Sequence, residues 1–241
     1  DELLIVRKEV DPCHELAAVT RAAQHSGNKT VLFENVSGSA MPVISNLYNS
    51  RQRLCEMIGA EPEGFCTRWN DIHDHTKSRA GSERTVIDRP TDLVDCSISD
   101  LPLITYHGKD AGPYFTSAIF LARHPDTGVE NLSFHRSMFI SDEELRVRLG
   151  SSHDLYRYQK AAEEKGEALD AVMLIGAEPS LFLAGGASLP GDWSEVAFAS
   201  AMKDAPIPSY KAKASDLMIP ASTQIVIEGR ILPNVRRPEG P

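Results

Sequence analysis

The sequence has 241 residues, enough to bury one large or two small hydrophobic cores. Its hydrophobic content of 41% and charged content of 24% are ordinary for a globular protein, and its net charge of −9 argues against a nucleic-acid-binding protein. No apolar run approaches the roughly 18 to 20 residues of a membrane span, and no segment has the pattern of a signal peptide, so we expect a cytoplasmic protein without a membrane anchor.

The first ninety residues predict a small α/β unit, which we place at 1–90. Asp11-Pro12, followed by apolar residues at helical spacing and then a glycine, predicts a helix with Asp11 as its N-cap. Residues 30–33 predict a short buried strand, and residues 50–58 a second helix that ends at a glycine. From residue 62 to residue 90 the pattern is polar with few periodic apolar residues, which favours a linker or a surface crossing.

Residues 91–241 predict a second unit that is richer in strands. The expected strands are 114–121, 132–140, 171–175 and 224–228, with a turn at 123–128 and helices at 155–165 and 193–202. These elements do not alternate regularly as β-α-β. The pattern therefore favours an α+β fold with a mixed sheet or barrel over a dinucleotide-binding fold.

Two kinds of site have only weak support. Asp71-Ile72-His73-Asp74-His75 offers imidazoles and carboxylates to zinc or iron, but it lacks helical ligand spacing and a distant third ligand, so a solvated polar stretch is favoured. The glycine-containing stretches 107–113 and 185–188 could approach a phosphate or a flat ligand, or could be simple loops. The cysteines form no Cys-x-x-Cys pair and are expected to be reduced thiols.

The most informative residues form a ligand set for a hard cation. Asn131, His153 and Glu195 offer an amide, an imidazole and a carboxylate, which together could hold a metal ion against a phosphate. The alternative for Glu195 is that it only complements the dipole of a helix that starts there.

A second pair of residues is suited to a carboxylate ligand. If 131–136 is a strand, Arg136 shares a face with apolar neighbours, and a buried charge of this kind needs a partner. Glu239 could be that partner. The alternative is an arginine that snorkels to solvent or forms a purely structural salt bridge.

Taken together, these residues resemble the UbiD family of reversible decarboxylases, which use prenylated FMN. The similar stretches are Leu101-Pro102-Leu103, Gly112-Pro113-Tyr114, Asp126-Thr127-Gly128, Asn131-x-Ser133-x-x-Arg136, His153, Glu195 and Pro238-Glu239-Gly240-Pro241. The resemblance covers nearly the whole chain apart from the polar stretch around His73. It implies that residues 91–241 form a split β-barrel of flavin-reductase type that binds the cofactor.

The resemblance also implies a metal and cofactor site. Asn131, His153 and Glu195 would hold Mn²⁺ or Mg²⁺, with K⁺ beside it, against the phosphate of prenylated FMN. The residues implied to bind the cofactor are Asn131, Ser133, Phe134, His135, Arg136, Arg148, Leu149, Gly150, Ser152 and His153.

In the family, Arg136 and Glu239 would act on an aromatic or α,β-unsaturated carboxylic acid. Arginine positions the substrate carboxylate, and the modified flavin is the electron sink that lets carbon dioxide leave. A non-catalytic flavin- or phosphate-binding module is the alternative. A flavin prenyltransferase that supplies the cofactor and a homo-oligomeric parent are the implied partners.

We expect the sequence to be part of a longer polypeptide. Asp1 is not an initiator methionine and begins an apolar, strand-like run, and the sequence stops at Pro241. The family's proton donor would lie five positions after Glu239, and a C-terminal domain would follow it. The expectation is therefore that these residues keep the metal and cofactor scaffold but are incomplete for turnover.

Overall fold

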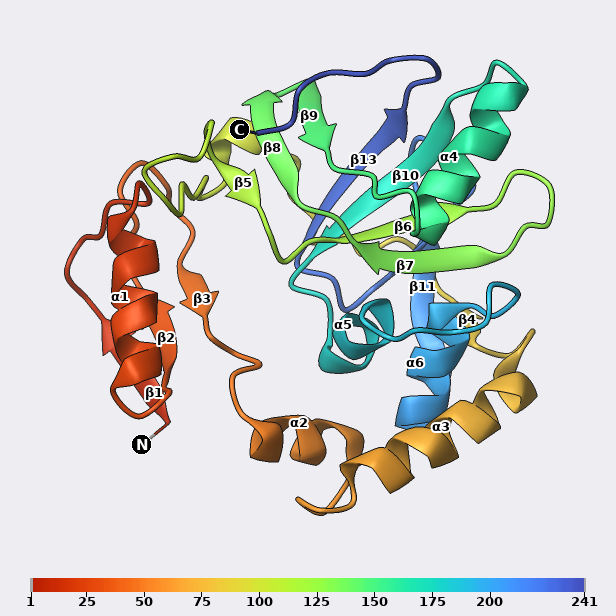
Figure 1. Cartoon of the computed structure of the whole chain (residues 1–241), viewed down its shortest axis with the longest axis horizontal. Coiled ribbons are helices and arrows are strands. Elements are labelled where there is room, and N and C mark those ends of the chain that lie inside the picture. The colour runs from red at the N-terminus through yellow and green to blue at the C-terminus, as the bar shows by residue number, and fades with distance from the viewer. Residues whose placement is uncertain (1, 241) are drawn as a thin grey trace.

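A four-stranded antiparallel sheet, in the order β13-β10-β6-β7, is the framework around which the chain is arranged (Figure 1). Its strands are β6 (Ile119–Arg123), β7 (Glu130–Phe134), β10 (Leu169–Ile175) and β13 (Ile225–Ile231). The computed structural model describes residues 2–240; Asp1 in the predicted first strand and Pro241 in the last motif lie outside the described residues. The strands predicted at 171–175 and 224–228 are confirmed as β10 and β13.

Helices cover both faces of this sheet. They are α4 (Asp154–Glu164), α5 (Pro179–Gly185) and α6 (Glu195–Lys203). Because side chains alternate along a strand, Phe120 and Met173 pack against α4 on one face, while Leu121 and Leu132 pack against α5 and α6 on the other. The helices predicted at 155–165 and 193–202 are confirmed as α4 and α6. Helix α5 was not predicted, since it is only seven residues long and starts at a proline.

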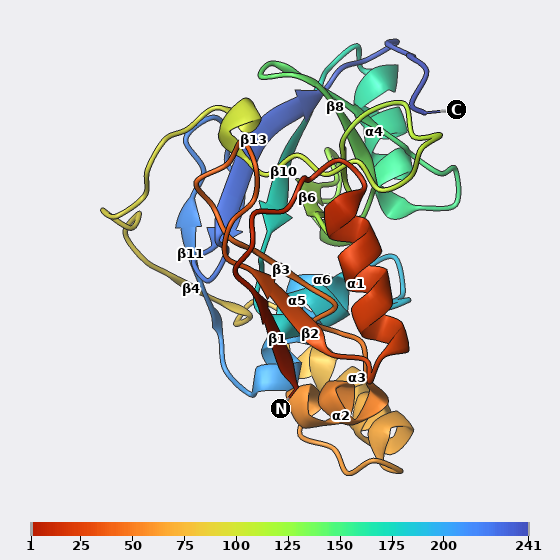
Figure 2. The ribbon, with the colours of Figure 1, turned by 90° about the vertical axis from the view of Figure 1, so that its left-hand side faces the viewer.

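The N-terminal residues form a three-stranded sheet with one helix on it (Figure 2). The elements are β1 (Leu3–Val6), α1 (Glu15–His25), β2 (Thr30–Phe33) and β3 (Val43–Ser45). Val31 and Phe33 are fully buried beneath α1, which confirms the predicted strand and helix. The helix starts later than predicted. Its N-cap is His14, while the Asp11 carboxylate accepts a hydrogen bond from the Cys13 amide at 2.7 Å and closes a turn before the helix.

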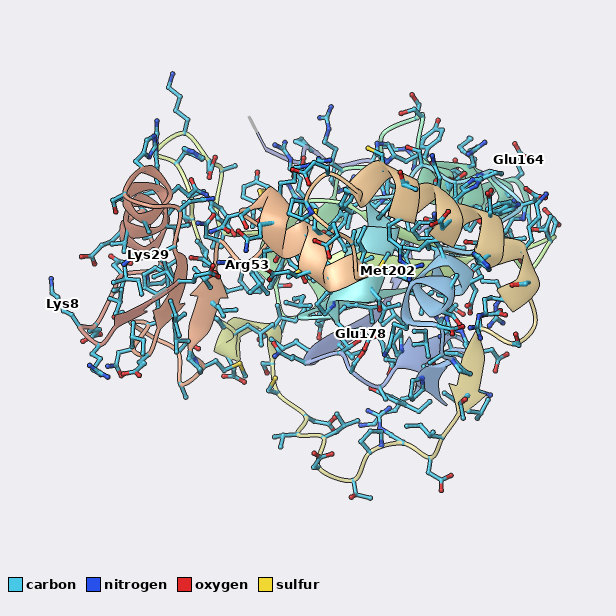
Figure 3. The ribbon with its side chains drawn as sticks, turned by 90° about the horizontal axis from the view of Figure 1, so that it is seen from below. Lys8, Lys29, Arg53, Glu164, Glu178 and Met202 are labelled. Carbon is cyan, nitrogen blue, oxygen red and sulfur yellow. The ribbon has the colours of Figure 1, made fainter. Side chains whose placement is uncertain are left out.

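The polar stretch predicted as a linker contains a helix, and this prediction was wrong. Helix α2 (Arg51–Ile58) follows the predicted course, with Ser50 as its N-cap and Gly59 in the left-handed conformation at its end. Then α3 (Phe65–Arg79) runs beside α6, as the view from below shows (Figure 3). Its buried face depends on Trp69, whose ring lies 4.9 Å from that of Phe198, and on Ile72, which is 1% exposed.

Two smaller sheets complete the fold. One, in the order β12-β11-β4, comprises β4 (Arg84–Val86), β11 (Ile207–Lys211) and β12 (Met218–Pro220). The other, in the order β5-β8-β9, comprises β5 (Tyr114–Phe115), β8 (Ser137–Ser141) and β9 (Glu144–Val147). A 3₁₀ helix, Ile98–Asp100, precedes them. No closed barrel is present within residues 2–240; the mixed α/β character is confirmed, whereas the split-barrel form and the boundary near residue 90 stay predictions.

The strands predicted at 114–121 and 132–140 are each broken in two, which corrects the sequence analysis. Phe115 pairs with Ser137 in one sheet, whereas Ile119 pairs with Phe134 in the other. The two paired segments therefore bend at matching positions, between residues 115 and 119 and between residues 134 and 137, and pass together from one sheet to the other. His135 and Arg136 lie at this corner, outside both ladders.

Candidate active site

Glu195 is buried against the edge of the four-stranded sheet. It occupies the first turn of α6, whose N-cap Ser194 accepts a hydrogen bond from the Val196 amide at 3.1 Å. Strand β7 is an edge strand, so the Leu132 N–H has no strand partner. The Glu195 carboxylate accepts from that N–H at 2.8 Å and from Asn131 Nδ2 at 3.2 Å. The helix start thus brings a carboxylate onto the strand that carries Asn131.

The environment of Glu195 favours a neutral carboxyl unless a cation is present. The pKa of Glu195 is raised to about 7, mainly by burial, which leaves the residue 5% exposed, and to a smaller extent by the negative charge of Asp154. The donors Leu132 N–H and Asn131 Nδ2 oppose this shift but carry no net charge. A buried carboxyl with only neutral donors is suited to binding a metal ion, because a cation would stabilise its ionised form.

A row of polar side chains follows from Asn131 along one face of β7. Asn131 and Ser133 lie opposite Ala122 and Phe120 in the ladder, so they share the α4 face of the sheet. Ser133 Oγ lies 2.7 Å from Asn131 Oδ1 and 3.0 Å from His135 Nε2, and His135 Nδ1 lies 3.0 Å from the Arg148 carbonyl oxygen.

In this row, one hydrogen-bond acceptor receives no hydrogen bond from the Ser133 hydroxyl. Burial is the main cause that lowers the pKa of His135, so its ring is neutral and its single N–H is directed to the Arg148 carbonyl. The Ser133 hydroxyl then has one hydrogen for two acceptors, His135 Nε2 and Asn131 Oδ1. If it donates to His135, Asn131 Oδ1 keeps a free lone pair. An amide oxygen in that state is a ligand that Mn²⁺ or Mg²⁺ accepts.

His153 stands at the N-terminal end of α4, beside this row. His153 is the N-cap residue of this helix, and the centroid of its ring lies 5.3 Å from that of the His135 ring. A cavity of about 590 Å³ opens here. Its walls contain Phe134, His135, Arg136, Arg148, Leu149, Gly150, Ser152 and His153, all predicted to bind the cofactor, and also Ser151 and Tyr156, which were not predicted.

We expect Gly150→Ala to displace His153 while leaving the fold intact. A Cβ atom at position 150 would lie 2.8 Å from His153 Cδ2, closer than two carbon atoms approach, and no other atom group is in the way. Affinity for Mn²⁺, measured by isothermal titration calorimetry, is expected to fall about tenfold, the lower end for loss of a supporting contact at a metal site.

Gly166→Ala, at a positive φ of 72° with open space around it beyond the other end of α4, is the control for a glycine substitution away from the site. Unchanged Mn²⁺ affinity in Gly150→Ala would show that the His153 imidazole does not ligate the metal.

Arg136 and Glu239 form the ion pair that the sequence suggested. Nε of Arg136 lies 3.0 and 3.2 Å from the two carboxylate oxygens, and Nη2 lies 3.0 Å from Oε2. The Glu239 side chain is 8% exposed, whereas that of Arg136 is 46% exposed. The carboxylate is therefore covered, while the guanidinium reaches solvent at the cavity mouth.

Other candidates are not part of this site. Asp71 and His75 lie on α3, where the carbonyl of Asp71 contacts His75 Nδ1 at 2.6 Å, and His73 packs on the ring of Trp193. Within residues 2–240 no group of three or more His, Cys, Asp or Glu side chains is placed to hold a metal. Gly185 packs against the ring of Phe134 and does not border an open space: a Cβ atom added at this glycine would lie 3.5 Å from that ring.

A larger cavity, of about 730 Å³, lies between α3, β4 and the start of α6. Three of its charged side chains are paired with one another: the Arg84 guanidinium contacts Glu130 at 2.6 Å and Ser209 Oγ at 2.7 Å, and Arg123 also contacts Glu130, although one buried carboxylate oxygen of Glu83 has no hydrogen-bond partner among the described residues. The smaller cavity offers the exposed guanidinium of Arg136 and the imidazole of His153, and it contains most of the predicted cofactor residues. All four cysteines are free thiols, and no described helix is long and apolar enough to cross a membrane.

Comparisons with known proteins identify the family of this chain. Family models match the 3-octaprenyl-4-hydroxybenzoate carboxy-lyase N-terminal domain over residues 1–72 and its Rift-related domain over residues 79–241. The anhydromevalonate phosphate decarboxylases of Methanothermobacter thermautotrophicus and Methanosarcina mazei are 34% and 30% identical over all of this chain, and over 55% and 54% of their own lengths. The chain thus spans about half the length of the curated relatives it matches.

Solved structures give the same assignment. The UbiD-class enzyme HmfF from Pelotomaculum thermopropionicum, in an evolved dimeric form in complex with prenylated FMN, has a TM-score of 0.86 and 33% identity, covering 100% of this chain and 56% of that one. Vanillic acid decarboxylase from Sedimentibacter hydroxybenzoicus shares the fold, with a TM-score of 0.89, 24% identity, and coverage of 100% and 54%. With family models over most of its length and a relative at 34% identity, the chain belongs to the UbiD family of carboxy-lyases.

Proposed function

We propose that the chain is part of a non-oxidative, reversible decarboxylase of aromatic or α,β-unsaturated carboxylic acids that uses prenylated FMN and a divalent metal. One observation carries the proposal: eight of the ten predicted cofactor residues line a single cavity, all except Asn131 and Ser133, and Arg136, held by Glu239, stands at its mouth. The family to which the chain belongs consists of carboxy-lyases, and a relative of known structure was solved with prenylated FMN.

The residues present fit the proposed metal. Glu195 supplies a buried carboxylate without a cationic donor, Asn131 supplies an amide oxygen that is free when the Ser133 hydroxyl donates to His135, and His153 supplies an imidazole at the cavity wall. Neutral ligands with one carboxylate leave enough positive charge on Mn²⁺ or Mg²⁺ to bind the cofactor phosphate. A potassium ion beside the divalent metal belongs to the proposal on the family resemblance alone.

The residues of the chain would bind and orient the substrate. When bound, prenylated FMN would supply the electron sink that lets carbon dioxide leave. Arg136 would bind the substrate carboxylate through the edge of its guanidinium that Glu239 does not occupy; in the described part of the chain Nη1 has no hydrogen-bond partner. Glu239, whose carboxylate accepts from both Nε and Nη2, would fix the plane of the guanidinium.

We also propose the setting in which this chemistry takes place. The parent protein would be a cytoplasmic homo-oligomer whose cofactor domain is a split β-barrel, and a flavin prenyltransferase would supply its cofactor. Because the chain spans about half the length of its relatives, turnover is best tested with the full-length natural protein.

The cofactor is tested by co-expressing the full-length protein with a flavin prenyltransferase. We expect the purified protein to carry a near-ultraviolet band that differs from that of FMN, and about one equivalent of Mn²⁺ by elemental analysis. It should release carbon dioxide from at least one acid in a panel that includes aromatic acids and phosphorylated and unphosphorylated enoic acids. A plain FMN band, or no band, together with no release from any acid, would favour a non-catalytic flavin-binding module.

A further inference from the structure

We propose that Tyr114 is a positioning residue that holds the Arg136–Glu239 pair in place. The structural part of this inference concerns only the described residues. Its consequence for turnover rests on the proposed function, in which Arg136 binds the substrate carboxylate.

The first observation is that the ring of Tyr114 lies beneath the guanidinium of Arg136. Tyr114 lies in β5, pairs with Met138 in β8, and is 7% exposed. The corner after β7 places Arg136 just before β8, so its Cζ lies 5.5 Å from the centroid of the Tyr114 ring. An arginine over an aromatic face at this distance is attracted by the ring.

The second observation is that Gly240 is wedged against the same two side chains. Gly240 has a φ of +88°, and a Cβ on it would lie 2.7 Å from Tyr114 Oη and 3.2 Å from Arg136 Nη2. Arg146 Nη1 donates to the Pro238 carbonyl at 3.1 Å, and Arg136 Nη2 donates to that of Glu239 at 3.4 Å. Residues 238–240 have no regular secondary structure, so these contacts hold the Glu239 carboxylate against Arg136.

The third observation concerns the hydroxyl of Tyr114, which is buried and has no hydrogen-bond partner within the described residues. The charged groups near this hydroxyl are Glu239, Arg136 and Asp110. A buried hydroxyl without a partner is unfavourable, so the benefit of this side chain lies in its ring and its shape. The ring limits the rotamers of Arg136, a side chain that otherwise has great freedom because it is half exposed.

The test measures how fast the Nε–H of Arg136 exchanges with water, by nitrogen-15 NMR of the chain. Replacing Tyr114 with leucine is expected to speed this exchange at least tenfold, because the guanidinium loses its support and leaves Glu239 more often. Tyr114→Phe keeps the ring and is expected to change exchange less than twofold. Tyr210→Leu is the matched control, since Tyr210 is 2% exposed and carries Arg89 over its ring at 5.3 Å, at another sheet.

A second pair of variants tests the wedge without removing the ring. Gly240→Ala is expected to speed Arg136 Nε–H exchange, and Tyr114→Phe in the same chain is expected to reverse part of that change, because removing the hydroxyl opens space for the new Cβ. Unchanged exchange in Tyr114→Leu would overturn the positioning role. No rescue of Gly240→Ala by Tyr114→Phe would overturn the wedge, because the effect of alanine would then come from backbone strain at a φ of +88° and not from contact with the hydroxyl. If exchange responds as expected but the full-length protein releases no carbon dioxide from any acid, the positioning role stands and the proposed function fails. If the full-length Arg136→Ala variant turns over normally, the positioning role stands and only Arg136 is removed from the proposed mechanism.

Discussion

Replacing Arg136 with alanine in the full-length protein is expected to lower kcat/KM for decarboxylation by about 10²- to 10³-fold, the size of effect seen when one preorganised donor is lost from an active site. The reason is geometric. The Arg136 guanidinium lines the cavity and donates through two of its nitrogens to the Glu239 carboxylate, so without it a substrate carboxylate would lose both a positive charge and a fixed orientation.

The same variant is expected to keep its flavin, because Arg136 is only one of ten residues that line the cavity. Bound flavin is measured by absorbance and turnover by release of carbon dioxide. Arg136→Lys should recover little activity, since an ammonium cannot hold a carboxylate and Glu239 in one plane. Arg230→Ala is the control, because Arg230 forms an exposed salt bridge with Asp170. Full activity in Arg136→Ala would remove this residue from the mechanism.

The second large effect is a dependence of stability on pH that belongs to Glu195. Its pKa is raised from 4.5 to about 7 in the folded protein. A carboxyl with a raised pKa favours folding below its unfolded pKa, and this contribution is lost as the pH rises through the folded value. For a shift of this size the free energy of unfolding of the metal-free chain should fall by about 3 kcal/mol between pH 4.5 and pH 8.

Glu195→Gln isolates this contribution, because other titrating groups, including His135, are the same in both proteins. We expect urea unfolding at several pH values to show a smaller loss of stability with rising pH in the variant. Adding Mn²⁺ at pH 8 should stabilise the wild-type protein, since the ion favours the carboxylate, and should stabilise the variant much less. Equal pH slopes in the two proteins would show that Glu195 does not titrate as its burial implies.

Much of the framework could be predicted from the sequence because local patterns specify it. Three segments carry their own sequence signal: the strand 30–33, the helix capped by Ser50 and ended by Gly59, and the apolar run 171–175, which lies within β10. Helix α3 could not be predicted this way, because its buried face is built from Trp69, Ile72 and Thr76 between charged residues and is buried only when α6 packs against it. Helix propensity is a weak guide where tertiary contacts determine whether a segment is helical.

In the candidate site, too, some features follow from the sequence and others depend on tertiary contacts. The kinds of residue and their order, together with the family resemblance, predicted Asn131, His153 and Glu195 as metal ligands and Arg136 as a substrate-binding residue, and these roles stay predictions. The broken strands that place Arg136 at a corner depend on which residues pair across the sheets, and no local pattern specifies that register. Tyr114 was included in a matching stretch, but its place beneath Arg136 follows from the pairing of β5 with β8.

The carboxylate on the Leu132 amide has a consequence for solubility. An open strand margin can recruit a strand from another molecule and start aggregation, and proteins commonly cover such margins with a helix. Helix α6 covers β7 in this way, and its buried Glu195 accepts the hydrogen bond of the Leu132 amide. Substitutions at position 195 therefore carry a risk of self-association, so a variant that loses activity there should be checked for its dispersed state by light scattering.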